Sequence, residues 1–222
     1  MKTRYSVLCV ALLAASATVA SDPTAGRIAL PKPRTEGTVS VETALHQRRS
    51  LRAPAVTPLT LTEVGQLCWA AQGITDAKGH RTAPSAHATY PLQLYVLAGA
   101  VEDLAPGLYR YVPAVHALEL VVAGDARLDF ERRGVGQAWI ARAPVIFVIS
   151  GSVRKMAGMG DRAAQLMAVE AGLASQGFFL QAEALGLGST YVGGFRPREA
   201  HDALKLPDGE EVLAVLPVGR KQ

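Results

Sequence analysis

The sequence has few of the residues that mark common metal, dinucleotide and hydrolase sites. It contains two cysteines in 222 residues, and its five histidines have no cysteine or carboxylate partner at ligand spacing. It also lacks a glycine-rich dinucleotide fingerprint before a helix and the glycine–any–serine–any–glycine pattern of a hydrolase nucleophile. No metal site is therefore predicted, and Rossmann-type and serine-hydrolase chemistry are excluded.

An excess of charge of one sign is also missing. The 23 Lys and Arg residues stand against 19 Asp and Glu, a formal net charge of +4. Removal of the first 20 residues would take away two basic residues and no acidic one, leaving +2. A nucleic-acid partner requires a clustered basic stripe, so none is predicted.

The N-terminus has the pattern of a cleavable export signal. Lys2 and Arg4 precede an apolar run over residues 7–15, and small residues follow to Ala20. This run is shorter than the ~20 residues that span a bilayer, so a signal peptide over 1–20 is favoured over a membrane anchor. We expect a periplasmic or secreted protein without a membrane span after cleavage.

Only Cys68 remains after cleavage, which excludes an intrachain disulfide. It lies between Leu67 and Trp69 in an apolar helical pattern and is predicted to be a buried thiol rather than a nucleophile.

The remaining chain is divided into an arm and one domain. Residues 21–39 contain three prolines without hydrophobic periodicity and are predicted as an extended linker or arm, and residues 40–222 form the domain. Four helices are expected, one from Val41 to before Pro54, one opening at Thr60 with a Glu63 capping box, one over 161–187 and one over 197–204.

Strand patterns alternate with these helices. Strands are predicted over 92–98, 107–111, 117–122, 145–150, 189–193 and 211–218. Since they form no regular βαβ repeat, we predict an α+β fold with a central mixed or antiparallel sheet flanked by helices.

The 161–187 helix suggests a second subunit. Between Arg162 and Gly188 its only charges are Glu170 and Glu183, and at 1.5 Å per residue it would measure about 40 Å. A chain of this size rarely buries such a helix alone, so we infer an extensive homodimer interface. The apolar stripe comprises Leu166, Val169, Leu173, Gly177, Leu180, Ala184 and Leu187.

Two segments could bind a phosphate. Arg48, Arg49 and Arg52 surround Ser50 at a helix end, where guanidinium groups make charge-assisted hydrogen bonds to phosphate. The alternative is that they stabilise the helix C-terminus. The C-terminal residues Gly219 and Arg220 could add positive charge, or they could belong to a solvated basic tail.

Two further segments could approach a flat ligand. The small-residue run over 81–88 includes the candidates Pro84, Ser85, Ala86 and His87 and leads into a strand. Its alternative is an ordinary loop. The second run offers backbone amides at Val192, Gly193 and Gly194. The neighbouring Tyr191 could donate a proton, although a tyrosine that only packs is favoured.

In their order along the chain, the four segments resemble the nitroreductase superfamily, most closely its branch similar to the dehydrogenase of azoline (thiazole and oxazole) peptide biosynthesis. The resemblance covers residues 40–220. It implies flavin mononucleotide (FMN) at a homodimer interface, with Arg48 and Ser50 at the phosphate, Arg52 near the ribityl chain and pyrimidine edge, and Arg220 completing the phosphate site.

The resemblance also implies that Pro84, Ser85 and Ala86 reach the flavin from the partner subunit, while Val192 to Gly194 lie beside the ring. Many relatives have a carboxylate where Gly193 stands, and close ones often have glycine where His87 stands. The resemblance therefore does not predict which residues form the substrate-facing wall of the site.

The implied activity is hydride transfer between a reductant and a small organic acceptor such as a nitroaromatic or quinone. NAD(P)H is the implied donor, but nicotinamide cofactors are scarce outside the cytoplasm, which conflicts with the export signal. Two alternatives stay open, a dehydrogenase that oxidises an unknown azoline-type substrate and a non-catalytic exported flavin-binding protein.

Overall fold

A computed structural model describes residues 26–221, so the predicted signal peptide lies outside the described residues. Its centre is a seven-stranded sheet of order β1-β4-β3-β2-β5-β7-β6, in which every neighbouring pair is antiparallel. The strands are β1 (Arg27–Ala29), β2 (Leu92–Ala98), β3 (Gly107–Val112), β4 (Ala117–Ala123), β5 (Val145–Gly151), β6 (Leu187–Ser189) and β7 (Glu211–Arg220).

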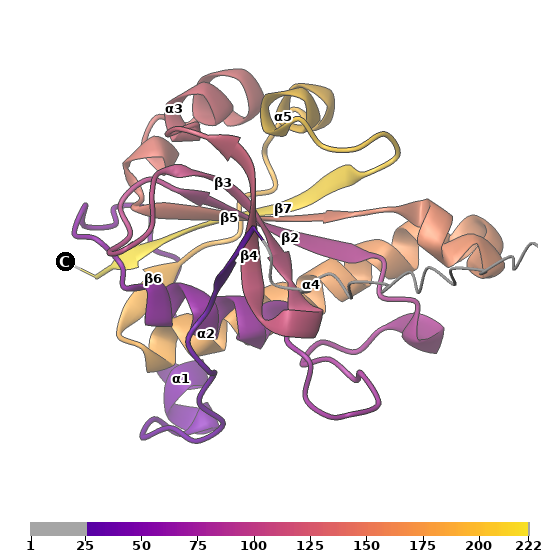
Figure 1. The fold of residues 1–222 in the computed structure, drawn as a ribbon, viewed down its shortest axis with the longest axis horizontal. Helices are drawn as coiled ribbons and strands as arrows, with labels where there is room; N and C mark the ends of the chain where they lie inside the picture. Colours follow the sequence, from indigo (N-terminus) through magenta and orange to yellow (C-terminus); the bar gives the residue numbers. More distant parts are fainter. Residues whose placement is uncertain (1–25, 222) are drawn as a thin grey trace, which may run out of the picture.

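Helices cover both faces of the sheet (Figure 1). Helices α1, α2 and α4 lie on one face, and α3 and α5 lie on the other, each group over its own buried apolar cluster. The predicted α+β class is confirmed, and the sheet is antiparallel. The helices are α1 (Val41–Gln47), α2 (Leu61–Gln72), α3 (Arg127–Phe130), α4 (Ala163–Ala184) and α5 (Pro197–Leu204).

Elements with strong local signals form where the sequence predicts them. At the start of α2, the Thr60 N–H donates to Glu63 Oε2 at 2.8 Å and the Glu63 N–H donates to Thr60 Oγ1 at 3.2 Å, which completes the capping box. Cys68 is fully buried in this helix, as predicted. Burial also raises the pKa of its thiol far above the usual range, so the thiol is not a nucleophile.

Helix α4 is shorter than predicted. Residues 161 and 162 belong to a 3-10 segment, and the chain leaves the helix near Gly186, whose φ of +71° favours glycine. Leu187 therefore lies in β6, and the strand predicted over 189–193 is wrong beyond Ser189. The helix measures about 33 Å at 1.5 Å per residue. In the described part of the chain no helix combines the length and apolarity needed to cross a bilayer.

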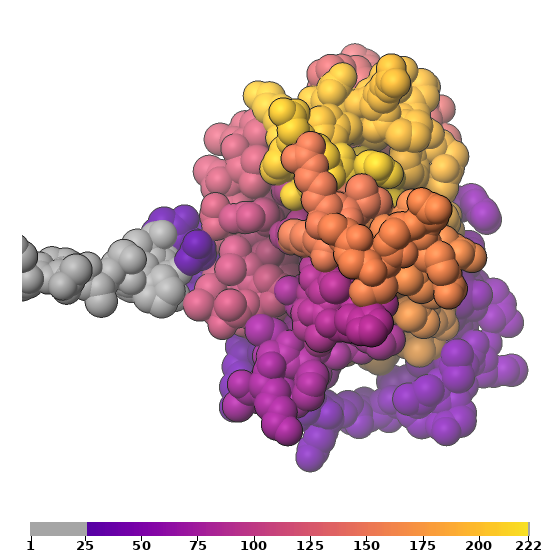
Figure 2. Space-filling model, turned by 90° about the vertical axis from the view of Figure 1, so that its right-hand side faces the viewer, coloured from indigo at the N-terminus to yellow at the C-terminus, as the bar shows by residue number. Residues whose placement is uncertain are grey.

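The described part of the predicted arm, residues 26–39, contacts the domain at two places. Residues 27–29 pair with β4 as an edge strand. The side chain of Gln66 then holds the backbone of Arg34, because Oε1 accepts from the Arg34 N–H at 2.8 Å and Nε2 donates to the Arg34 oxygen at 3.0 Å. Figure 2 shows the segment after residue 34 standing away from the rest of the molecule around an opening. At this place a cavity of about 450 Å³ separates residues 34–41 from α2 and α4.

Candidate functional site

The arginine-rich segment after α1 lies against the far end of β7. The Leu51 N–H donates to the Ser189 oxygen at 3.1 Å, and the Ala55 N–H donates to the Arg220 oxygen at 3.0 Å. Strand β7 extends to Arg220, two residues beyond the prediction, so Gly219 and Arg220 are part of the sheet and not a solvated tail. The fold therefore brings together the two segments predicted to bind a phosphate, residues 48–52 and residues 219–220.

Glycines permit this close approach. A Cβ atom on Gly219 would lie 2.7 Å from Pro54 Cβ, and one on Gly188 would lie 2.7 Å from Leu51 Cδ2. Any larger residue would displace the segment that follows α1. Packing alone thus accounts for glycine at position 219, one of the predicted cofactor-binding residues.

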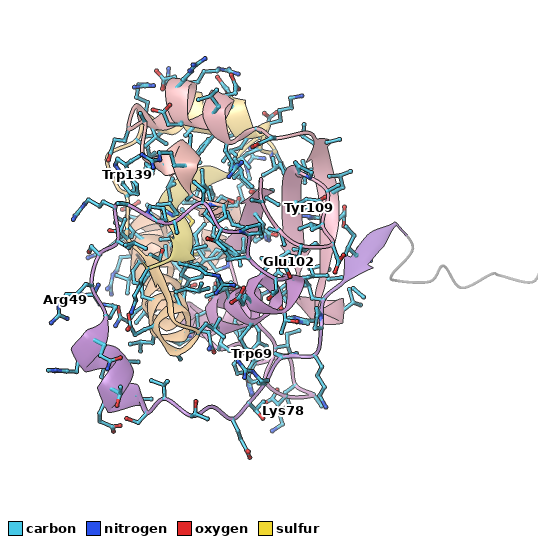
Figure 3. All side chains as sticks on the ribbon, turned by 90° about the vertical axis from the view of Figure 1, so that its left-hand side faces the viewer. Arg49, Trp69, Lys78, Glu102, Tyr109 and Trp139 are labelled. Carbon is cyan, nitrogen blue, oxygen red and sulfur yellow. The ribbon has the colours of Figure 1, made fainter. Side chains whose placement is uncertain are left out.

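The three arginines of this segment differ in their partners. Arg49 Nη1 donates to the carbonyl oxygens of His46 and Arg48 at 2.9 and 2.8 Å, which is the helix-terminus role. It lies at the outer edge of the molecule (Figure 3). The side chains of Arg48 and Arg52 have no acceptor within residues 26–221, and neither has the Ser50 hydroxyl. These three groups remain available to a ligand.

Arg220 already has a partner inside the chain. Its Nη1 and Nη2 donate to the two carboxylate oxygens of Glu63 at 3.0 and 3.1 Å. Glu63 also caps α2, so Arg220 links the end of β7 to that helix. A phosphate at this place would share Arg220 with Glu63.

The glycine pair after β6 presents unused backbone donors. Val192 is bonded to Val215 in both directions, at 2.9 and 3.3 Å. In the part of the chain that the structure describes, the N–H groups of Gly193 and Gly194 have no acceptor, and both residues are exposed. Consecutive free amides suit the polar edge of a ring system.

Tyr191 packs over this turn. Its hydroxyl donates to the Leu213 oxygen at 2.8 Å, and a Cβ on Gly193 would lie 2.9 Å from Tyr191 Cε1. The ring is half exposed, but its proton is already donated to a carbonyl, which favours packing over proton donation.

Sequence reasoning missed two neighbours of the glycine pair. Gln137 Nε2 donates to the Gly194 oxygen at 3.5 Å, and Trp139 Nε1 donates to Gln137 Oε1 at 3.2 Å. Both precede β5 in an irregular segment. No periodicity or motif there could have placed them beside residue 194.

The loop that carries Pro84 to His87 is tied to α4. The Ala86 N–H donates to Glu170 Oε1 at 2.8 Å, and Ser85 Oγ accepts from the Tyr90 N–H at 2.9 Å. His87 has a φ of +51°, in the left-handed region that disfavours side chains with a Cβ. This conformation explains why glycine suits that position.

Within one chain this loop lies far from the candidate segments at residues 48–52 and 219–220. The loop precedes Leu92, which pairs with Gly151 at one end of the sheet, whereas Ala98 pairs with Val145 and then Val218 at the other end. A strand rises about 3.4 Å per residue, so the two ends are about 20 Å apart. Figure 1 shows the start of β2 and the C-terminus on opposite sides. Within one chain, this loop and the phosphate candidates therefore do not form a single site.

Known proteins are similar to this chain over most of its length. Residues 45–220 match the model of the nitroreductase family. A protein of Methanocaldococcus jannaschii named as a nitroreductase is 35% identical over 184 residues, which are 82% of this chain and 92% of that protein.

Solved structures agree with this match. A protein of Ralstonia eutropha JMP134, also named as a nitroreductase, has a TM-score of 0.77 at 30% identity, covering 91% of this chain and 93% of that one. The NADPH:FMN oxidoreductase of Vibrio harveyi, solved with NAD+, has a TM-score of 0.59 at 19% identity over 82% of this chain and 69% of that one, a likeness of fold alone.

Proposed function

The chain belongs to the nitroreductase family, and we propose that it is an FMN-dependent oxidoreductase that transfers a hydride between a reductant and a small organic acceptor such as a nitroaromatic or quinone. The observation that carries the proposal is a set of ligand groups without internal partners along one edge of the sheet. Family membership supports oxidoreductase chemistry, and these groups support FMN as the cofactor.

The charge pattern of the site fits a phosphorylated ligand. Arg48 and Arg52 offer two guanidinium groups with no acceptor within residues 26–221, and Ser50 forms a backbone bridge with Ser189. Arg220 adds a third guanidinium that is shared with Glu63. We propose that Arg48 and Ser50 hold the phosphate and that Arg52 lies toward the ribityl chain.

The free amides lie at a suitable separation from these groups. Ser189 pairs with Val218 and Val192 bridges Val215, three residues apart on β7, which corresponds to about 10 Å. We propose that the N–H groups of Gly193 and Gly194 face the polar edge of the flavin ring. When bound, the flavin supplies the carrier for two electrons, and the chain supplies binding and orientation.

We propose further that two copies complete each site. The Pro84 to Ala86 loop lies about 20 Å from the phosphate end of its own chain, which supports the assignment of this loop to the site of the second copy. The exposed face of α4 supports a dimer because it contains no charged residue. Its exposed residues are Ala164, Gln165, Ala168, Val169, Gly172, Leu173 and Gln176.

The electron donor and the compartment are part of the proposal. The N-terminal pattern favours export, and an exported reductase would need a donor other than a cytoplasmic pool of NAD(P)H. We therefore propose that a membrane quinol or a dithiol reduces the protein where it works, and that NAD(P)H serves as a donor in the test tube.

The experiment is a spectrum of the chain from Ser21 onward, purified by size exclusion and then denatured to release its ligand. Oxidised-flavin absorption and about one FMN per subunit of a dimer would support the proposal. A colourless monomer that does not take up FMN would overturn it. A flavin that binds but accepts no electrons from NAD(P)H, quinols or dithiols would identify a non-catalytic flavin-binding protein instead.

A further inference from the structure

A small polar cavity lies between the end of α2, Arg81, the start of β2 and the end of β3, away from the proposed phosphate site. It has a volume of about 50 Å³, and its polar lining comes from Gln72, Arg81, Gln93 and Tyr111. A water molecule needs about 10–15 Å³ of such volume, so the cavity has room for about three waters or for one small ion with a water.

Arg81 is a cation without an anion in this cavity. Its Nη1 donates to Gln72 Oε1 at 2.7 Å, and its guanidinium carbon lies 4.5 Å from the centre of the Tyr90 ring. Among residues 26–221 no carboxylate lies within ion-pair distance of it. Burial lowers the pKa of Arg81, because a charge withdrawn from water is stabilised only by a partner.

The carboxylates of α4 and of the sheet have other partners. Glu119 pairs with Arg110 at 3.1 Å and also with Arg27. Glu210 accepts from Ser150 Oγ at 2.8 Å and from the Tyr95 hydroxyl at 3.1 Å. Glu170 of α4, which contacts the 81–90 loop, accepts from the Ala86 N–H at 2.8 Å, and none of these three carboxylates pairs with Arg81.

The charges around Arg81 are of both signs. Burial lowers the pKa of Lys155, and among its charged neighbours Glu210 acts most strongly and raises that pKa, while Arg81 and Arg110 lower it. Within the described residues, the amide nitrogens of Gln72 and Gln93 have no acceptor. The cavity thus combines a cation with two available donors, which is the composition of an anion site.

We propose that this cavity binds a small monovalent inorganic anion, represented by chloride, with Arg81 as its cation and the side-chain amides of Gln72 and Gln93 as donors. Because Arg81 stacks on Tyr90, the anion would hold both ends of the strained 81–90 loop. The site requires neither a flavin nor a second subunit.

The test is the line width of the chloride-35 NMR signal in the presence of the chain from Ser21 onward. The wild type should broaden the signal saturably, and bromide should compete. Arg81→Gln should weaken binding about tenfold or more, the loss expected for a charge-assisted hydrogen bond. Arg142→Gln is the matched control, because Arg142 is exposed and its side chain has no partner within residues 26–221.

Equal broadening by the wild type and by Arg81→Gln would overturn the proposal, because the effect would then come from the surface. Gln93→Leu covers the case in which Arg81→Gln fails to fold, since it removes a donor and keeps the charge. Crystals soaked in bromide give an independent result, in which an anomalous peak beside Arg81 supports the site and a water at that position contradicts it. Each outcome is independent of whether the protein binds FMN.

Discussion

The inner and outer faces of α4 are both nearly free of charge, yet the described chain covers only one of them. The inner face packs Met167, Ala174 and Phe178 against the sheet and α2, with at most 1% of each residue exposed. On the outer face, Val169 and Leu173 remain 54% and 46% exposed. Apolar composition alone thus does not tell which face of a helix the chain covers.

The same contrast separates the polar groups. Arg49 and Arg220 are satisfied by the chain itself, whereas Arg48 and Arg52 have no acceptor among residues 26–221. The internal hydrogen bonds of Arg49 and Arg220 give these two side chains a structural role. Groups of the second kind point to a ligand or a partner, and the predictions below test that difference.

The largest effect is expected on the inner face. Phe178→Ala removes a fully buried ring whose centre lies 4.8 Å from that of Phe147, so the free energy of unfolding should fall by about 3–5 kcal/mol. Urea denaturation measures it. Gln176→Ala, at an exposed position of the same helix, should change the free energy by less than about 0.5 kcal/mol. Similar losses for both variants would show that the two faces do not differ.

A charge on the outer face should break the proposed dimer without unfolding the subunit. Leu173→Asp places a carboxylate where we expect the partner, and it should weaken dimerisation about 100-fold, a cost of about 3 kcal/mol. Sedimentation velocity across a dilution series measures this. Leu120→Asp is the control, because Leu120 is 49% exposed on β4. If Leu120→Asp dissociates the protein and Leu173→Asp does not, α4 is not the interface.

Arginines with and without internal partners should differ in ligand binding. Arg48→Ala should weaken FMN binding by about 10- to 100-fold, since a hydrogen bond to a charged group contributes about 1.5–3 kcal/mol. Arg49→Ala should change it less than about threefold, because Arg49 already donates to backbone carbonyls. Titration of flavin fluorescence measures both. Equal losses would indicate general electrostatic attraction.

The smallest effect concerns strain in the 81–90 loop. His87→Gly should raise the free energy of unfolding by about 1 kcal/mol, because glycine tolerates a φ of +51°. Thermal unfolding monitors the gain. Ala77→Gly, at an exposed loop position without a positive φ, should bring no gain. A destabilised His87→Gly variant would mean that the histidine side chain makes a contact worth more than the strain.

Prediction from sequence succeeded where the signal is local. The Thr60–Glu63 capping box, the apolar run of β5 and the start of α5 at Pro197 lie at the predicted places, since each depends on residues a few positions apart. The end of α4 was wrong by three residues, because the helical apolar spacing continues through Leu187, which packs as strand β6.

The candidate site was predictable as residues but not as an arrangement. The residue types at 48–52, 84–87 and 192–194 indicated the family, which the comparisons confirm. The place of Gln137 beside Gly194 and the ion pair of Arg220 with Glu63 join residues 57 and 157 positions apart. No local pattern encodes such contacts.

The sequence by itself determined the element types, the α+β class and the family, because hydrophobic period, capping and motif order are properties of neighbouring residues. Only the tertiary structure decided which face of α4 the chain covers, which arginines have internal partners and how far the 84–87 loop lies from residues 219 and 220. The physical reason is that burial and pairing depend on which distant segment arrives beside a residue, and that is settled by the packing of the whole chain.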